Sequence, residues 1–318
     1  MVEIKQRSLE VNGLQMRVAE AGEGPLVVLL HGFPETWYSW RHQLAALADA
    51  GFHAAAPNQR GYPGTDSPDD VADYNILHLV GDVIGLIAAL GEQTATVVGH
   101  DWGSPVAWHT ALLRPDKVRG VAGLSVPPNR RGNSPTLAAL RARFGPDYYQ
   151  LYFQRPGIEA EFEADLDRTF RRLLVGVSGD SGQVRQLTVP AEGGFLGAWP
   201  APVELPAWLT EADVRTYASS FTESGFTGPL NWYRNLDRNW ALTAAWHGAR
   251  ITPPALVVVG DRDPIVAALD LDRLARSLRG FVPNLGDFTV LAGAGHWIQQ
   301  ERPDEVNAAL VNFATTTS

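Results

Sequence analysis

Two hydrophobic patterns open the chain. Apolar and polar residues alternate over residues 7–11 and 14–20, and the Asn12-Gly13 pair between them favours the tight turn of a β-hairpin. Residues 25–30 (PLVVLL) are continuously apolar, as expected for a strand that is buried on both faces of a sheet. The chain is therefore predicted to begin with an antiparallel hairpin followed by a fully buried strand.

Helical and strand patterns then alternate up to residue 127. Apolar residues recur with helical spacing over three segments that end at Gly or Pro: residues 36–51, 75–91 and 104–115. Short apolar runs that predict strands stand between and after them: residues 53–61, 94–101 and 118–128. Strands that alternate with helices indicate a parallel sheet with helices on both faces.

This alternation is interrupted between residues 128 and 247. Helical patterns over residues 157–176 and 210–225 flank residues 189–208, which are rich in Gly and Pro and are typical of a loop. The sheet pattern returns at residue 254 and continues through two strands and two helices to the end of the chain. We therefore expect helices, and no strand of the sheet, in the interrupted part.

The resulting fold class is α/β, with a mostly parallel central sheet, helices on both faces and an inserted helical cap, or lid. Residues 1–127 and 248–318 are predicted to form the core domain, and residues 128–247 the cap. An insertion that follows a sheet strand lies over the carboxyl ends of the strands, where α/β proteins bind ligands.

Composition narrows the class of protein. Of 318 residues, 45% are hydrophobic and 19% are charged, which is ordinary for a globular enzyme. A net charge of −9 argues against a nucleic-acid partner, and the absence of Cys excludes disulfides and a Cys nucleophile. No signal peptide and no apolar run long enough to span a membrane is visible. We expect a cytoplasmic protein without a membrane partner, and the sequence leaves a homodimer open.

Candidate chemistry begins at residues 99–103 (GHDWG), which follow a predicted strand and have the spacing of a nucleophile elbow. Asp101 stands where such an elbow usually holds Ser. Catalytic triads on these sheets run in the chain order nucleophile, acid, histidine, and His296 follows a later strand. Asp261 and Asp263 both follow the strand that begins at residue 254, which lies between Asp101 and His296 in the chain. The spacing does not show which of the two orients His296. The other Asp is expected to cap the next helix.

Two backbone amides are candidates for an oxyanion hole. Residues 31–37 (HGFPETW) follow the buried strand, so the N–H of Phe33 should point into the site. The N–H of Trp102 comes directly after the nucleophile and should point there as well. His31 and His100 flank these positions and are expected to be structural.

An Asp nucleophile limits the reaction. A carboxylate is already an anion at pH 7 and can displace a leaving group from saturated carbon, which gives an ester of Asp101. A histidine can then activate water to hydrolyse that ester. The leaving group is an alkoxide or a halide. A neutral phenol can protonate an alkoxide, and the predicted cap carries Tyr in residues 147–157 and 225–240.

Five segments together resemble the soluble epoxide hydrolases of the α/β-hydrolase fold, over nearly the whole chain. They are HGFPETWYSWRHQ (31–43), GHDWG (99–103), YQLYFQRPGIEAE (149–161), GFTGPLNWYRNLDRNW (225–240) and GHWIQQERPDEV (295–306). The core motifs are shared with haloalkane dehalogenases, whereas the two cap motifs discriminate between the families.

The resemblance implies a role for each candidate residue. Asp101 would be the nucleophile, His296 the water-activating base and Asp263 its acid partner. Tyr149 and Tyr233 would hold the epoxide oxygen. The resemblance further implies a cis Phe33–Pro34 bond. The mechanism needs no metal and no organic cofactor, and the sequence shows no H-E-x-x-H motif, dinucleotide loop or P-loop, so the expected partners are a small epoxide and water. Pro34, Trp232 and Trp297 are expected to line the substrate pocket. Tyr148 and Tyr152 are expected to be bystanders or part of the pocket wall.

Three other functions compete with an epoxide hydrolase. A haloalkane or haloacid dehalogenase would use the same Asp101 and His296. An esterase with a hydroxyl nucleophile lacks its Ser in the elbow. A ligand-binding receptor on the same fold would not need the complete set of catalytic candidates.

Overall fold

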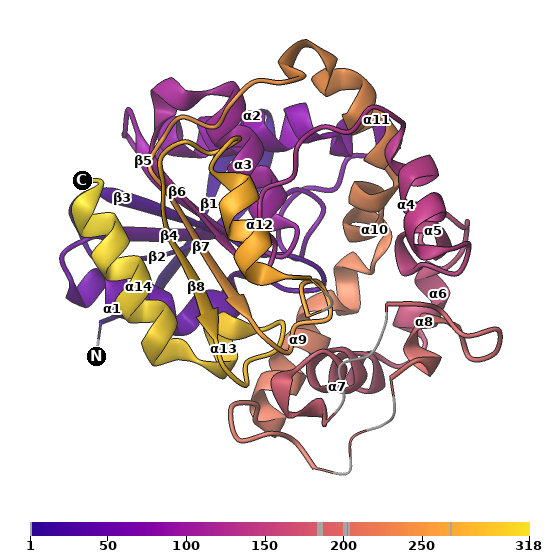
Figure 1. Cartoon of the computed structure of the whole chain (residues 1–318). Helices are drawn as coiled ribbons and strands as arrows, with labels where there is room; N and C mark the ends of the chain where they lie inside the picture. Colours follow the sequence, from indigo (N-terminus) through magenta and orange to yellow (C-terminus); the bar gives the residue numbers. More distant parts are fainter. Residues whose placement is uncertain (1, 183–186, 200–201, 203, 268) are drawn as a thin grey trace.

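The computed structural model describes residues 2–182, 187–199, 202, 204–267 and 269–318. Within these residues the strands form one sheet in the order β1-β2-β4-β3-β5-β6-β7-β8 (Figure 1). The predicted hairpin is present as β1 (Lys5–Val11) and β2 (Leu14–Ala21). Asn12 and Gly13 join them with φ angles of 52° and 78°, and β2 also pairs antiparallel with β4 (His53–Pro57).

All further pairs in the sheet are parallel, as predicted. These strands are β3 (Leu26–Leu30), β5 (Ala95–His100), β6 (Val118–Leu124), β7 (Ala255–Gly260) and β8 (Leu285–Leu291). Every residue of β3, β5 and β7 is buried, because helices cover both faces of the sheet. Parallel pairing brings the carboxyl ends of these strands to one edge.

The core has two parts, one on each face of the sheet. Successive strand residues point to opposite faces, so Val97 belongs to one apolar cluster and Val98 to the other. Helices α2 (Ile76–Ala89), α3 (Gly103–Leu113) and α12 (Leu271–Leu278) supply the first cluster. Helices α1 (Arg41–Asp49), α13 (Ile298–Glu301) and α14 (Pro303–Thr316) supply the second.

A helical segment, called the insertion below (residues 125–254), connects β6 to β7, which are paired neighbours in the sheet. It lies beside and below the sheet in the view of Figure 1. Its helices are α4 (Thr136–Phe144), α5 (Tyr149–Tyr152), α6 (Glu159–Glu163), α7 (Leu166–Gly176), α8 (Gly194–Gly197), α9 (Glu211–Ser224), α10 (Thr227–Arg234) and α11 (Leu236–Leu242). In its described part, the only β-pairing is one isolated bridge between Tyr148 and Thr188.

The structure departs from the predicted elements in two places inside the insertion. The helix expected over residues 157–176 is divided, because Asp165 has extended backbone and caps α7 by accepting the Arg168 N–H. The loop expected over residues 189–208 contains the single helical turn α8, and residues 200, 201 and 203 of that loop lie outside the described residues.

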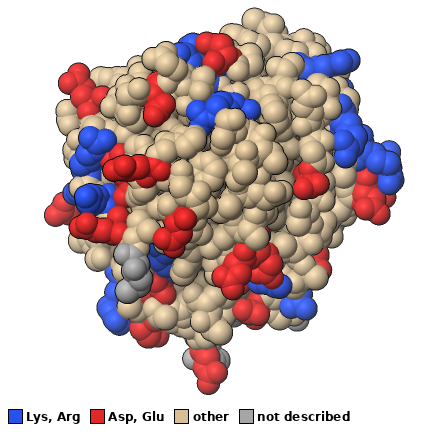
Figure 2. Space-filling model, turned by 90° about the vertical axis from the view of Figure 1, so that its left-hand side faces the viewer, with Lys and Arg blue, Asp and Glu red and all other residues tan. Residues whose placement is uncertain are grey.

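The surface carries charges of both signs. Figure 2 shows acidic and basic side chains interspersed over one face of the molecule, without a continuous basic area on that face. The longest described helices, α2, α9 and α14, have 14 residues each, and the described part of the chain holds no helix able to span a bilayer.

Candidate active site

Asp101 lies on a sharp turn between β5 and α3. Its φ of 49° falls in the left-handed region, which L-residues rarely adopt. The glycines on either side permit the turn, since a Cβ added to Gly99 would lie 2.0 Å from the carbonyl oxygen of Gly103. A Cβ on Gly103 would lie 2.0 Å from the Leu30 carbonyl oxygen. This backbone presents the Asp101 side chain at the carboxyl edge of the sheet.

The structure brings the three distant candidates together. His296 Nε2 lies 3.3 Å from Oδ2 of Asp101, and His296 Nδ1 donates to Oδ2 of Asp263 at 2.9 Å. Asp263 is fully buried, and its other oxygen accepts the Ile265 N–H at 2.8 Å. The imidazole is therefore held between two carboxylates, one from the loop after β7 and one from the elbow after β5.

Asp261 does not take the place expected for it. Its carboxylate accepts the Gly293 N–H at 2.7 Å, in the loop that follows β8. The N-cap of α12 is instead Asp270, whose side chain accepts the Arg273 N–H. Of the two aspartates left open by the spacing, Asp263 contacts His296, and the prediction that the other would cap a helix is wrong.

The charges in this group stabilise one another. Burial alone would raise the pKa of Asp101, but the hydrogen bond and charge of His296 outweigh burial and hold that pKa below its ordinary value. Burial alone would lower the pKa of His296, yet the nearby charge of Asp263 and the contact with Asp101 raise it well above 6.5. The structure thus favours an ionised Asp101 beside a protonated His296.

The loop after β3 supplies a backbone donor to Asp101. The Phe33 N–H donates to Oδ1 of Asp101 at 2.7 Å, and the Phe33–Pro34 peptide bond is cis. Gly32 is required beside it, because an added Cβ would lie 2.3 Å from the Cβ of Asp101. Trp102 is the N-cap residue of α3, and amides at a helix start have no partner within the helix.

Tyr149 and Tyr233 come from the insertion and lie together over the elbow. Tyr149 begins α5 and Tyr233 is on α10; both are buried, with ring centroids 6.1 Å apart. Burial raises the pKa of each phenol well above 10, and the charge of Asp101 adds to this effect. The Gln150 side chain donates to the Tyr149 hydroxyl oxygen at 2.9 Å, and a hydrogen bond with the Tyr148 side chain adds to the raised pKa of Tyr149.

Asp101, His296, Tyr149 and Tyr233 line one cavity. It encloses about 450 Å³ of empty space, part of which is open to solvent. Its polar lining side chains are Asp101, His296, Tyr149 and Tyr233, and all its other lining residues are apolar. The apolar ones are Phe33, Pro34, Phe153, Leu173, Val177, Leu187, Phe195, Pro264, Ile265 and Trp297.

Trp232 does not line this cavity, unlike Pro34 and Trp297. Its indole N–H donates to the carbonyl oxygen of Arg60 at 3.1 Å, and its ring packs against Tyr62 and Trp102. The expected pocket role of Trp232 is therefore corrected to a contact between α10 and the loop after β4.

Tyr148 and Tyr152 also lie outside the cavity lining. The ring of Tyr148 stacks on Phe144 with centroids 4.4 Å apart, and the Tyr152 hydroxyl donates to Glu161 at 2.8 Å. Both act as packing residues.

Within the described residues, no group of three or more His, Cys, Asp or Glu side chains is arranged to hold a metal ion.

Comparison with known proteins places this geometry in a family. A family model described as alpha/beta hydrolase fold matches residues 25–303. Epoxide hydrolase A of Mycobacterium tuberculosis is 46% identical over 98% of this chain and 97% of its own length. Epoxide hydrolase 3 of Siraitia grosvenorii is 42% identical over 98% of this chain and 99% of its own length. The chain belongs to the epoxide hydrolases of the α/β-hydrolase fold.

Solved structures agree with this assignment. The crystal structure of Epoxide Hydrolase A from Mycobacterium thermoresistibile matches this epoxide hydrolase with a TM-score of 0.92 and 47% identity, covering 98% of each chain. Epoxide hydrolase VrEH1 from Vigna radiata matches with a TM-score of 0.91 and 41% identity, over 99% and 98% of the two chains. The predicted fold and the predicted family are both confirmed.

Glu35 is fully buried in this epoxide hydrolase, although no sequence pattern predicted a role for it. One oxygen of its carboxylate accepts the Gly32 N–H at 3.2 Å and lies 2.7 Å from Nδ1 of His100, while the other accepts from Gln299 at 2.9 Å. Glu35 thereby joins the loop that carries Phe33 to the segment after His296. A charged residue two positions after Phe33 is visible in the sequence, but its burial is not.

The expected structural roles of His31 and His100 agree with their contacts. Burial lowers the pKa of His31 to about 4, and its neutral ring accepts the Gln59 N–H at 3.1 Å. His100 Nε2 and the Ser125 hydroxyl each lie 2.7 Å from the backbone oxygen of His296. These contacts fix the backbone of His296 from the side of the sheet.

Proposed function

We propose that this member of the epoxide hydrolases converts epoxides to vicinal diols through a covalent ester on Asp101. The observation that carries the proposal is the shared cavity. Its lining includes a carboxylate next to a histidine, together with two buried phenols.

In the first step, Asp101 attacks a ring carbon of the epoxide, and the carbon–oxygen bond of the ring breaks. Tyr149 and Tyr233 hold the ring oxygen, and one of them gives it a proton as it becomes an alkoxide. Their raised pKa values keep both phenols protonated at neutral pH. The product is a hydroxyalkyl ester of Asp101.

In the second step, His296 takes a proton from water, and the hydroxide attacks the carbonyl carbon of the ester. The N–H groups of Phe33 and Trp102 stabilise the oxyanion, and the diol leaves as the Asp101 carboxylate re-forms. His296 passes the proton that it took from water to the departing oxygen, which completes the second hydroxyl of the diol, and the other proton of the water restores the phenol. Because Asp101 has no charge in the ester, it no longer raises the pKa of His296. The imidazole therefore releases its proton to the solvent and is neutral when it must accept one from water.

The cavity lining favours an uncharged, lipophilic epoxide. Apart from the four reactive side chains, its wall is aromatic and aliphatic and offers no partner for a charged group on the substrate. We assign residues 128–247 to a cap that carries both phenols, and residues 1–127 and 248–318 to the core that carries Asp101, Asp263 and His296.

A dehalogenase would share the ester chemistry but has no use for a proton donor. Halide leaves as a stable anion, whereas the alkoxide from an epoxide must be protonated. Two buried phenols with raised pKa values therefore favour the epoxide as substrate.

A single turnover in heavy-oxygen water tests the proposal. The enzyme, in excess over an aryl epoxide, should incorporate the heavy oxygen into the Asp101 side chain, because water attacks the carbon of the ester. The peptide that contains Asp101 is then analysed by mass spectrometry. Label in the diol of the first turnover, with none in the peptide, would mean that water attacks the epoxide directly.

The double variant Tyr149→Phe, Tyr233→Phe provides the matched comparison. It retains the carboxylate and the histidine but has no acid, so ester should not form from the epoxide. Undiminished ester formation in this variant would refute the acid assignment.

A further inference from the structure

The loop that carries His296 is bound directly to the insertion. The His296 N–H donates to the carbonyl oxygen of Val177 at 2.9 Å. The indole N–H of Trp297 donates to the carbonyl oxygen of Leu174 at 2.8 Å. Both acceptors belong to the end of α7 and the turn after it, so the proposed base and the insertion share hydrogen bonds.

Two glycines allow the backbones to approach at this contact. A Cβ added to Gly295 would lie 2.1 Å from the backbone nitrogen of Gly179, and a Cβ added to Gly179 would lie 2.2 Å from the Gly293 carbonyl oxygen. Side chains on either glycine would separate the segments. The loop and the insertion therefore meet backbone to backbone.

Glu301 connects the same two segments from the end of α13. One oxygen of its carboxylate accepts the Gly179 N–H at 2.9 Å and the Gly295 N–H at 2.8 Å. The other oxygen accepts the Trp297 N–H at 3.0 Å. Three amides, from the insertion and from both sides of His296, thus converge on one side chain.

These contacts require a carboxylate. Burial raises the pKa of Glu301, and the three amides act against that rise because they stabilise the charged form. Within the described part of the chain, Glu301 forms no ion pair: the adjacent Arg302 pairs with Glu305 instead. A Gln side chain at position 301 could accept hydrogen bonds only through its carbonyl oxygen. Its NH₂ group would face a backbone N–H, which is also a donor.

We infer that Glu301 is a positioning residue that fixes the His296 loop against the insertion and thereby sets the rate of ester hydrolysis. The inference rests on the proposed function, since it concerns the second step of that reaction. Glu301 contacts neither the cavity nor the reacting atoms. It acts through the backbone on both sides of the base.

The two chemical steps depend differently on this loop. Asp101 is held by the elbow and by the Phe33 N–H, and ring opening takes its proton from the phenols. Ester hydrolysis needs His296 at hydrogen-bond distance from a water that is itself aligned with the ester carbon. A small displacement of the loop should therefore slow the second step far more than the first.

The test compares Glu301→Gln with Glu305→Gln, which removes an equal charge from an exposed side chain on the next helix. Rapid quenching and mass spectrometry of the intact protein follow the ester as it forms and decays. Glu301→Gln should slow ester decay by about 10- to 100-fold while ester formation changes by less than about threefold. Glu305→Gln should leave both rates unchanged.

Steady-state kinetics give a second signature. When ester decay limits turnover, kcat and KM fall together and kcat/KM is nearly preserved. Loss of folded protein would instead lower kcat and kcat/KM equally and leave KM unchanged. Equal slowing of both steps in folded Glu301→Gln, or no slowing of either, would overturn the inference. If this variant does not fold, Glu301→Asp, which keeps the charge at a shorter reach, carries the same test with a smaller slowing of decay.

The outcome separates this inference from the proposed function. If the wild-type enzyme forms no ester on Asp101, the proposed function fails whatever Glu301 does. If the wild-type enzyme forms and hydrolyses the ester and Glu301→Gln does the same at equal rates, only the role of Glu301 is refuted.

Discussion

Asp101 must remain charged in a site that is largely closed to water, and two neighbours make this possible. The Phe33 N–H and the imidazole of His296 both stabilise its anion, at 2.7 Å and 3.3 Å. The same imidazole depends on Asp263 for its orientation. The charge state of each of these side chains thus depends on its neighbour. A substitution at one position should therefore shift the pKa of another.

Asp263→Asn should therefore change the pH dependence of ester hydrolysis in a defined direction. The charge of Asp263 raises the pKa of His296, so its removal lowers that pKa. His296 acts as a base only when neutral, and hydrolysis is lost as the pH falls through its pKa. The acid limb should move to lower pH, and the maximal rate should fall on the order of 10⁴-fold because the ring loses its orienting partner.

The matched control is Asp261→Asn. Asp261 binds the Gly293 N–H and makes no contact with His296, so the acid limb should stay where it is in the wild-type enzyme. Single-turnover decay of the ester, measured across the pH range, distinguishes the two variants. An unmoved limb in Asp263→Asn would show that Asp263 does not control the base.

Individual site residues were predictable to different degrees. Asp101 and His296 follow from chain order, because each stands after a strand. The spacing did not separate Asp263 from Asp261, and only the family resemblance favoured Asp263; in the turn after β7 the Asp263 N–H binds the Gly260 carbonyl oxygen, and its carboxylate meets His296. Trp232 was misplaced because adjacent helical residues point in different directions, so a cavity that contains Tyr233 does not contain its neighbour.

Helix α10 is seated on the core by close backbone packing. A Cβ added to Gly228 would lie 2.3 Å from the Gly61 carbonyl oxygen, in the loop after β4. The Trp232 indole binds Arg60 in the same loop, and the Asn235 side chain donates to the Val71 carbonyl oxygen at 2.6 Å. These contacts determine how far Tyr233 reaches into the cavity.

Gly228→Ala should displace this helix. The added methyl group would meet backbone that cannot yield, which should cost about 1 to 3 kcal/mol of unfolding free energy and slow ester formation through Tyr233. Denaturant unfolding and single-turnover kinetics measure the two effects. Gly132→Ala is the control, because its nearest neighbouring atom would be 4.0 Å away, and an equal loss in both variants would contradict the argument.

At the level of elements, the sequence predicted the sheet better than the insertion. Continuous apolar runs and alternation mark strands and core helices, because the sheet buries them in a regular way. The break between α6 and α7 depends on the single cap Asp165, which periodicity does not detect. The seating of α10 depends on glycine contacts between segments far apart in the chain, for which a single sequence gives no signal.

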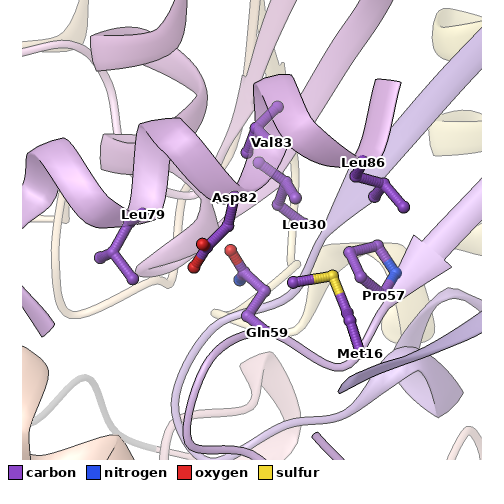
Figure 3. A pocket seen from close by; sticks show the side chains of 8 residues that line it. All are labelled: Met16, Leu30, Pro57, Gln59, Leu79, Asp82, Val83 and Leu86. Atoms are coloured by element: carbon purple, nitrogen blue, oxygen red, sulfur yellow. The ribbon is translucent and has the colours of Figure 1, made fainter. Parts of the chain in front are cut away.

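A buried ionic group links the hairpin, the loop after β4 and helix α2. Arg60 donates two hydrogen bonds to Asp82, at 2.7 Å and 2.6 Å, and the Asn12 side chain donates to Asp82 at 2.8 Å. Asp82 also lines a small cavity beside Gln59 (Figure 3). Three parts of the core that are distant in sequence are held by one carboxylate.

Asp82→Asn should weaken the whole molecule. It leaves the buried guanidinium of Arg60 without its counter-charge, which should cost about 3 to 5 kcal/mol of unfolding free energy. Thermal and denaturant unfolding give this value. Asp116→Asn, which disrupts an exposed pair with Arg114, should cost far less, and similar losses in the two variants would refute the role of burial.

The expected location in the cytoplasm and the homodimer that the sequence leaves open stay predictions.

The placement of the insertion between two paired strands has an evolutionary consequence. Because β6 and β7 are parallel neighbours, the polypeptide leaves the sheet at the carboxyl end of β6 and returns to the amino end of the adjacent strand, so no other strand lies between its exit and its return. Another module could replace the insertion without breaking a sheet ladder. Asp101 would be kept, while Tyr149 and Tyr233, which are proposed to protonate the leaving oxygen, would be exchanged together. One scaffold can in this way acquire new leaving-group chemistry in a single genetic event.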